Sequence, residues 1–115
     1  MDTYLLQVTA NGDITRIPFD PANSYNQLSD AVGGYIELVP TGRDIDLFCN
    51  EEGKLTGLPF NMVLTGYYRK CRPTADSIVG NGVFCKSDAE GETLGLTKWE
   101  CVDLENELGR IKSQV

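Results

Sequence analysis

The densest group of polar side chains beside a constrained backbone lies between positions 50 and 61 of the chain. The candidate ligand-binding residues are Asn50, Glu52, Lys54, Asn61 and Arg69, the last from a basic segment further along. An asparagine amide can recognise a polar edge, a lysine or arginine can bind an anionic group such as phosphate, and a carboxylate accepts hydrogen bonds. These residue types predict a small recognition pocket or edge.

The same residues also have a structural interpretation. Asn50 can cap its own turn, and the carboxylates of Glu51 and Glu52 can simply be solvated, as turn carboxylates usually are. Asn61 can either cap a short helix that follows Pro59 or reach into a site. We favour the structural interpretation for the two glutamates and leave both open for Asn61.

A second candidate surface is the basic and aromatic segment at residues 67–72. Its candidate partner-binding residues are Tyr67, Tyr68, Arg69 and Arg72, to which Trp99 is added from the last predicted helix. Tyrosine and arginine are favoured as anchors in protein interfaces, and an arginine fork can bind phosphate in two places. A plain surface loop explains the segment equally well. Trp99 can instead serve a homodimer contact.

Several kinds of chemistry are excluded or disfavoured. The 115-residue chain has no histidine, so Ser-His-Asp and Cys-His catalysis and most zinc sites are ruled out. Its acidic residues lack the spacing of a calcium loop, and no phosphate-binding glycine loop occurs. Four cysteines, at positions 49, 71, 85 and 101, form no CxxC pair, so we expect reduced, buried thiols. We predict no catalytic residue, metal or cofactor, and keep an enzyme with Glu51 or Glu52 as general base as the least favoured alternative.

Charge and hydropathy restrict the partners. The chain has 17 acidic and 10 basic residues and a formal net charge of −7, so it lacks the basic surface that nucleic acid requires. It contains no run of about 20 apolar residues that could cross a bilayer. Its N-terminus has no secretory leader. We therefore expect a cytoplasmic protein, a single domain over residues 1–115, without nucleic-acid or membrane partners.

The hydrophobic pattern predicts the elements that position these residues. The expected strands are residues 3–10, 13–19, 35–39, 45–49 and 76–86. The expected helices are residues 24–32, a proline-initiated helical turn at 58–64, and a C-terminal amphipathic helix that begins at Thr97. Short hairpins rather than long crossovers favour an α+β fold, a mostly antiparallel sheet of four to six strands with two or three short helices.

Local residues predict where these elements start and stop. Asn11-Gly12 predicts a hairpin turn between the first two strands, because both residues accept positive φ. Ser24 and Gln27 form a capping box, and Gly53 takes a left-handed turn position. Further expectations concern helix ends and faces: Gly33-Gly34 and Gly66 as stops, Thr97 with Glu100 as a capping box, Tyr25, Leu28 and Val32 on one packed face, and Cys101, Leu104, Leu108, Ile111 and Val115 as the buried stripe.

Three motifs carry a family resemblance. They are residues 32–37 (VGGYIE), residues 50–61 (NEEGKL, GLP and the final asparagine) and residues 78–80 (IVG). The chain resembles an uncharacterised family, a domain of unknown function, found in phages, prophages and mobile elements. The resemblance implies a continuous strand through Gly80 and a phage or mobile-element context, but no reaction. The sequence departs from the family pattern after Leu64.

These observations lead to three functional hypotheses. The first is a small phage or mobile-element accessory protein that acts without catalysis by binding a host component, most plausibly a host protein, in the host cytoplasm. The second is a protein that binds or sequesters a nucleotide or signalling metabolite. The third is the enzyme with a carboxylate base.

Overall fold

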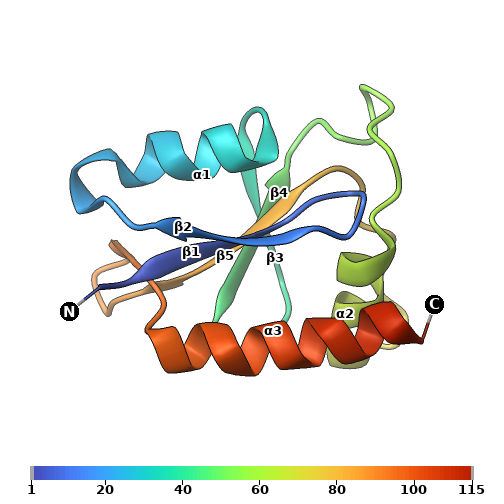
Figure 1. Cartoon of the computed structure of the whole chain (residues 1–115). Helices are drawn as coiled ribbons and strands as arrows, with labels where there is room; N and C mark the ends of the chain where they lie inside the picture. The colour runs from blue at the N-terminus through green and yellow to red at the C-terminus, as the bar shows by residue number, and fades with distance from the viewer. Residues whose placement is uncertain (1, 115) are drawn as a thin grey trace.

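One antiparallel sheet organises the molecule in the computed structural model, which describes residues 2–114 (Figure 1). The elements in chain order are β1 (Tyr4–Val8), β2 (Ile14–Pro18), a 3₁₀ turn (Pro21–Asn23), α1 (Ser24–Val32), β3 (Ile36–Val39), β4 (Asp46–Asn50), α2 (Met62–Cys71), β5 (Gly82–Ser87), β6 (Thr93–Leu94) and α3 (Lys98–Ser113). The strand order is β2-β1-β5-β4-β3, and β6 pairs with the end of β5. This arrangement confirms the predicted α+β class and the amphipathic C-terminal helix.

Helices cover both faces of the sheet. In Figure 1, α1 lies on one side and α2 and α3 lie on the other. Because successive strand residues point to opposite faces, Leu5 of β1 packs in the layer under α1, whereas Leu6 and Val8 pack in the layer under α2 and α3. Helices thus cover both faces of the sheet. Its two edge strands are β2 and β3, which stand at the ends of the strand order.

The first hairpin forms where it was predicted, but through a longer turn. Thr9 donates its N–H to the carbonyl of Asp13 at 2.9 Å, which leaves Ala10, Asn11 and Gly12 as the loop. Only Gly12 has a positive φ, at 89°. The predicted hairpin is therefore confirmed, but Asn11 does not adopt the positive φ that the Asn-Gly signal allows.

Helix α1 has the predicted bounds but a different N-terminus. A 3₁₀ turn precedes it, and Asp20 caps that turn by accepting a hydrogen bond from the Ala22 N–H. The Ser24–Gln27 capping box is absent, because the Gln27 side chain instead bonds the backbone of Asp20 and Pro18. Gly33 ends the helix at φ 79°, as predicted.

The predicted packed face of α1 is only partly correct. Leu28 and Val32 are buried, whereas Tyr25 is 53% exposed. The glycine prediction in the following loop was also wrong: Gly53 is not among the residues with positive φ, and Gly57 takes the left-handed position at φ 72°.

Helix α2 corrects the sequence prediction most strongly. It begins at Met62 rather than 58, and it continues through Gly66, which was expected to stop it. A Cβ on residue 66 would lie 2.7 Å from Cγ2 of Ile111, so the glycine serves the packing of α2 on α3. The first turn is capped by the side chain of Asn61, which accepts a hydrogen bond from the Leu64 N–H at 2.9 Å.

The predicted strand 76–86 is shorter and not continuous. β5 begins at Gly82, and Val79 contributes only an isolated bridge to Phe60. Gly80 interrupts the extended backbone with φ 75°, which corrects the strand expected to run through it. Sequence reasoning missed the short strand β6.

Helix α3 agrees closely with its prediction. Both halves of the Thr97–Glu100 capping box are present. The buried residues of the helix are Cys101, Leu104, Leu108 and Ile111. The fifth predicted stripe residue, Val115, lies outside the described residues.

Candidate binding site at the edge of strand β3

The outer edge of β3 carries backbone groups that β4 does not use. The Tyr35 carbonyl accepts a hydrogen bond from the Glu51 N–H at 2.9 Å, next to the paired register Ile36↔Asn50 and Leu38↔Phe48. Because hydrogen-bonded and non-bonded pairs alternate along an antiparallel ladder, the N–H and C=O groups of Ile36 and Leu38 point away from β4. β3 ends the strand order, so these groups form a free sheet edge.

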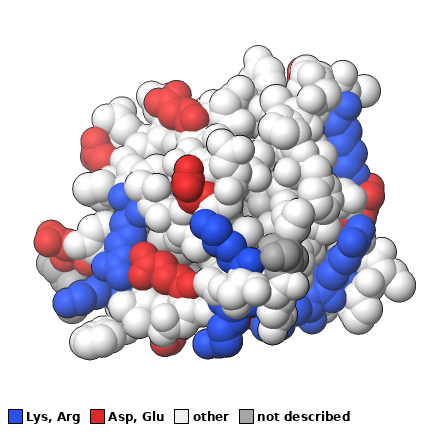
Figure 2. Space-filling view, turned by 45° about the vertical axis from the view of Figure 1, so that its right-hand side comes forward, with Lys and Arg blue, Asp and Glu red and all other residues white. Residues whose placement is uncertain are grey.

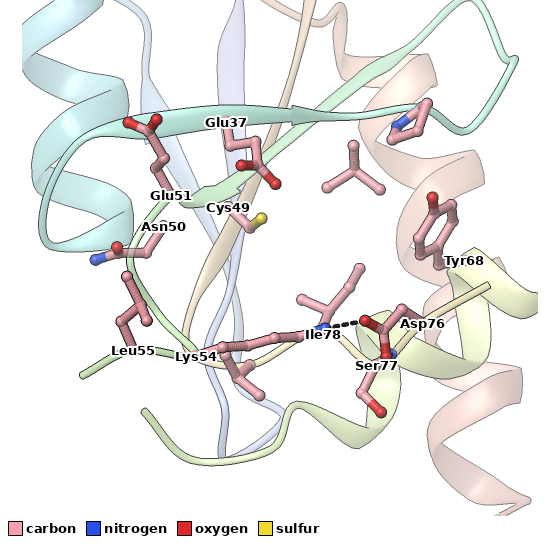
Figure 3. Close-up of a pocket in the computed structure, with 13 residues that line it drawn as sticks. Glu37, Cys49, Asn50, Glu51, Lys54, Leu55, Tyr68, Asp76, Ser77 and Ile78 are labelled. Atoms are coloured by element: carbon pink, nitrogen blue, oxygen red, sulfur yellow. Dashed lines mark hydrogen bonds and ion pairs between the residues drawn. The ribbon is translucent and has the colours of Figure 1, made fainter. Parts of the chain in front are cut away.

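A cavity of about 350 Å³ opens beside this edge, on the face of the sheet that α2 and α3 cover (Figure 3). Its lining is Glu37, Val39, Pro40, Cys49, Asn50, Glu51, Lys54, Leu55, Tyr68, Asp76, Ser77, Ile78 and Val79. Val39 and Ile78 are buried and contribute to the core. The cavity therefore has an apolar base and a polar rim.

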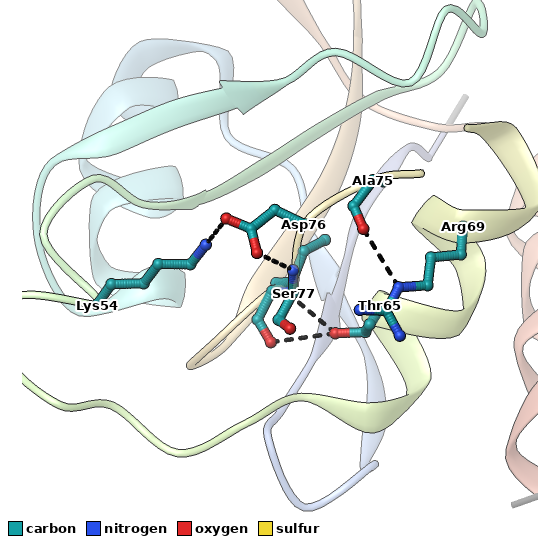
Figure 4. Close-up of polar contacts among 7 residues, drawn as sticks. Lys54, Thr65, Arg69, Ala75, Asp76 and Ser77 are labelled. Atoms are coloured by element: carbon teal, nitrogen blue, oxygen red, sulfur yellow. Dashed lines mark hydrogen bonds and ion pairs between the residues drawn. The ribbon is translucent and has the colours of Figure 1, made fainter. Parts of the chain in front are cut away.

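One ion pair spans the rim. Lys54, in the loop after β4, contacts the carboxylate of Asp76, which also accepts a hydrogen bond from the Ser77 N–H at 2.8 Å (Figure 4). The hydrogen bond from Lys54 is the main reason that the pKa of Asp76 is lowered, with the Ser77 N–H adding to it. The Lys54 charge is thus already engaged.

The other charges at the rim are acidic. Glu37 and Glu51 are exposed and take part in no ion pair within residues 2–114. Figure 3 draws both carboxylates next to the β3 ribbon, Glu37 from β3 itself and Glu51 from the start of the loop that follows β4. The unbalanced charge of the rim is therefore negative.

Cys49 lies at the base of the cavity but is not a reactive thiol. Burial, with the nearby Glu37 charge adding to it, raises the pKa of Cys49 to about 11. The thiol is consequently protonated at neutral pH and acts as a small apolar group.

The segment that closes the cavity on one side is held by helix α2. The Thr65 hydroxyl accepts a hydrogen bond from the Ile78 N–H at 2.9 Å and lies 3.3 Å from the Ile78 carbonyl. Arg69 donates from Nε to the Ala75 carbonyl at 3.2 Å. Figure 4 shows the Arg69–Ala75 contact to the right of Asp76 and the contacts of Thr65 below it. Residues 75–78 therefore form a wall that is set by the fold before anything binds.

The structure brings together only part of the predicted ligand-binding set. Asn50 and Lys54 line the cavity, whereas Glu52, Asn61 and Arg69 do not. Asn50 also caps its turn, because its Oδ1 accepts a hydrogen bond from the Glu52 N–H at 2.8 Å. Arg69 lies behind the wall rather than in it, where it bonds Ala75.

Asn61 has a structural role. It is fully buried, donates from Nδ2 to the Gly80 carbonyl at 2.9 Å and to the Val8 carbonyl at 3.3 Å, and accepts from Leu64. One side chain thus joins α2 to β1 and to Gly80, two residues before the start of β5. Of the two interpretations left open, the helix cap is the one observed.

The predicted partner-binding segment does not form one surface. Tyr67 is fully buried and packs edge-on against Phe84, with ring centroids 5.1 Å apart. Tyr68 is half-buried and lines the cavity. Arg72 donates to the Pro40 carbonyl. Trp99, which is 72% exposed, lies on α3 with the Lys98 ammonium 5.6 Å from its ring centroid.

The residues that sequence reasoning missed are mostly the apolar ones. The missed apolar residues are Val39, Pro40, Cys49, Leu55, Ile78 and Val79, and the missed polar residues are Glu37, Asp76 and Ser77. The two-residue period of β3 could have placed Glu37 and Val39 on one face. Nothing local in the sequence indicates that Ile78 would meet them.

On the face of the molecule in Figure 2, basic and acidic side chains are interspersed, and no large patch of one sign is seen there. Among residues 2–114 no group of three or more cysteine, aspartate or glutamate side chains is arranged to hold a metal ion. In the same residues, no helix combines the length and the apolar character needed to cross a membrane.

Fold and site define a small α+β protein with a polar-rimmed cavity beside an open sheet edge. The chain belongs to the family described as "Domain of unknown function (DUF3846)", whose model matches residues 4–109. This confirms the part of the predicted resemblance that concerns an uncharacterised domain. Neither the curated proteins nor the solved structures contain a significant match.

Proposed function

We propose that this protein acts by binding rather than by catalysis, and that it binds an extended segment of another protein along β3. The observation that carries the proposal is the position of the outward backbone groups of Ile36 and Leu38 directly beside the cavity. A strand added to a sheet edge gains affinity from main-chain hydrogen bonds and specificity from pockets that receive alternate side chains. Here the edge and a pocket occur together.

The chemistry of the rim indicates which side chain would enter the cavity. Lys54 is paired with Asp76, whereas Glu37 and Glu51 are unpaired within the described chain, so an incoming cation is favoured. The stem of a lysine or arginine can pack against the ring of Tyr68 while its charge remains near the carboxylates. We therefore propose a partner segment with a basic residue at the position that faces the cavity.

The other sheet edge is a weaker candidate. β2 ends at Pro18, whose carbonyl already accepts a hydrogen bond from Gln27, and proline offers no N–H to a new strand. Arg16 of the same strand is fixed by Glu105, with Nε–Oε2 at 2.7 Å. β3 has no comparable contact at Ile36 or Leu38 in the described chain.

We further propose that the protein belongs to a phage or mobile element and that its partner is a host protein in the host cytoplasm. The support for this context is the resemblance carried by the VGGYIE and NEEGKL motifs at residues 32–37 and 50–55. β3 overlaps the first motif and the cavity rim overlaps the second.

The test is a selection from a library of short displayed peptides, followed by two substitutions at one position. Leu38→Pro removes the outward N–H of β3 but no β3–β4 hydrogen bond, whereas Leu38→Thr keeps that N–H. We expect Leu38→Pro to weaken the selected peptides by at least about tenfold and Leu38→Thr by less than about threefold. Equal binding by the native protein and both Leu38 variants would overturn the proposal. So would binding that is abolished only by Trp99→Ala.

A second candidate function is small-molecule binding in the same cavity, since Asn50, Lys54 and Tyr68 all line a space of about 350 Å³. A nucleotide phosphate would have to displace Asp76 from Lys54 and approach Glu37 and Glu51, so an anionic ligand fits less well. A rise in melting temperature with a nucleotide or metabolite, lost in Lys54→Ala, would favour this candidate.

A further inference from the structure

Helix α3 presents a second stripe of residues on the side opposite its buried ones. The stripe follows the chain at intervals of three, four, three and four residues: Trp99, Val102, Asn106, Gly109 and Ser113. This spacing places all five on one face of the helix, and none of them is buried. In Figure 1, α3 runs along the lower border of the molecule, and no other helix or strand of residues 2–114 lies below it. The outer face of α3 is therefore open to a partner.

Two residues of this stripe are not explained by packing within the chain. Trp99, the only tryptophan, is 72% exposed. Gly109 lies inside the helix, where glycine is less stable than alanine. A Cβ on residue 109 would meet nothing within 4 Å, so the fold does not require a glycine there as it does at Gly66. A large exposed ring and an empty position thus share one helix face.

A second copy of α3 that runs antiparallel fits this face. Stripes with this spacing pack in layers, and in an antiparallel pair each layer joins two positions that are symmetric about one centre. With the centre at position 104, Trp99 of one copy lies over Gly109 of the other. In the same register, Val102 of one copy lies beside Asn106 of the other. The largest side chain of the stripe therefore meets the position without one.

The charges beside the stripe agree with the same register. Side chains that flank such a stripe contact one another between the two helices and set their orientation. In the antiparallel pair, Asp103 of one copy lies near Arg110 of the other, and Lys98 of one copy lies near Glu105 of the other. Both of these contacts join opposite charges, and each occurs twice because the pair is symmetric.

The first of these charge pairs is the better one to test. Asp103 and Arg110 take part in no ion pair within residues 2–114. Glu105 already accepts two hydrogen bonds from Arg16, with Nε–Oε2 at 2.7 Å and Nη2–Oε1 at 2.6 Å. A substitution at Glu105 would therefore also disturb the contact of α3 with β2, whereas substitutions at Asp103 and Arg110 break no contact of the single copy.

We propose that this face of α3 binds a second copy of the chain and forms a two-fold dimer through an antiparallel pair of α3 helices. One helix from each copy buries less than the roughly 1,600 Å² of a standard interface, so we expect a weak dimer with a dissociation constant on the order of 100 µM. The dimer uses neither β3 nor its cavity, and it is independent of the peptide-binding function proposed above.

Sedimentation equilibrium measures the dimer directly. Over a range from about 10 µM to about 1 mM, the native protein should change from mainly monomer to mainly dimer. Emission of the single tryptophan should shift to shorter wavelength over the same range, because the ring leaves water when the dimer forms.

Two substitutions test the contact between the ring and the glycine. Trp99→Ala should weaken the dimer by at least about tenfold, as expected for a central aromatic anchor. Gly109→Gln should weaken it by a similar factor, because the new side chain occupies the space of the ring, although it should not destabilise the monomer. The control is Tyr25→Ala, at an aromatic residue of α1 that is 53% exposed, and it should leave the dissociation constant within about twofold.

A charge exchange tests the register. Asp103→Arg alone, or Arg110→Asp alone, places like charges together at two contacts of the dimer and should weaken it by about fivefold. The double variant re-forms opposite pairs and should restore the native dissociation constant within about twofold. An equimolar mixture of the two single variants should also associate, because each contact then joins unlike copies. In a parallel pair these two positions would not meet, and neither combination would restore binding.

Several results would overturn the proposal. One is a native protein that stays monomeric at about 1 mM. Another is a dimer that survives Trp99→Ala, or one that Tyr25→Ala weakens equally, since either would place the contact elsewhere. Single charge variants whose weakening is not reversed by combination would contradict the antiparallel register. Amide spectra recorded at low concentration, where the protein is monomeric, show that each variant is folded.

Discussion

The Tyr35 carbonyl accepts a hydrogen bond from the Glu51 N–H at 2.9 Å, and this one contact sets the direction of every backbone group on β3. It makes Tyr35 and Glu51 a hydrogen-bonded pair, so the backbone groups of Glu37 and Val39 face β4 while those of Ile36 and Leu38 face outward. The same alternation places the Glu37 side chain over the cavity and the Leu38 side chain on the opposite face.

Amide hydrogen exchange should follow this alternation in the free protein. The N–H groups of Ile36 and Leu38 should exchange at least about 100-fold faster than those of Glu37 and Val39, because only the latter are bonded to β4. Exchange measured by NMR checks this. Equal protection of all four amides would show that something already covers the edge, and protection that grows with protein concentration would identify a second copy of the chain.

Asn61→Ala should lower the free energy of unfolding by about 3 kcal/mol, because it removes a helix cap and leaves buried backbone groups without their partner. Urea denaturation gives the value. Asn106→Ala, at an exposed position of α3, should change stability by less than about 0.5 kcal/mol. A similar small effect at both positions would refute the structural role assigned to Asn61.

Two helical glycines should respond in opposite directions to the same change. A Cβ on residue 109 would meet nothing within 4 Å, so Gly109→Ala should stabilise the protein by about 0.5–1 kcal/mol through helix propensity. Gly66→Ala would bring its Cβ to 2.7 Å from Ile111 and should destabilise by about 1 kcal/mol or more. Thermal unfolding of both variants tests the close contact of α2 and α3. Stabilisation by both would contradict it.

Stability at high pH should depend on Tyr67. Its pKa is raised from 10.0 to about 12 in the folded protein, so the unfolded chain ionises first. Below pH 10 the hydroxyl is protonated in both the folded and the unfolded protein, and the stability is at its full value. As pH rises from 10 toward 12 only the unfolded chain loses this proton, so the free energy of unfolding falls by up to about 2 kcal/mol. Urea denaturation over this range should therefore show a shallower decline for Tyr67→Phe than for the native protein. Parallel declines would mean that the hydroxyl is not buried in solution.

Sequence reasoning succeeded where the relevant contacts are local. The Thr97–Glu100 capping box and the left-handed stop at Gly33 involve residues a few positions apart, and both were predicted correctly. Helix α2 was misjudged because the role of Gly66 depends on Ile111, which is distant in the chain and packs against it. A local rule treats every such glycine as a helix end.

For the candidate site too, local contacts could be predicted from the sequence and long-range contacts could not. Asn50 and Lys54 were found because they belong to one polar segment, whereas Cys49 and Ile78 join them only through the tertiary fold. The basic and aromatic segment was interpreted as a continuous surface, but it is helical, so consecutive residues point in different directions. Tyr67 consequently enters the core.

The most direct test of the account is amide exchange at β3 with and without a peptide selected from the displayed library. If the peptide adds a strand to the sheet, the amides of Ile36 and Leu38 should become strongly protected, while the outward amides of Ile14 and Arg16 on β2 continue to exchange as before. Peptide binding that leaves Ile36 and Leu38 unprotected would contradict the proposal that β3 is the binding edge.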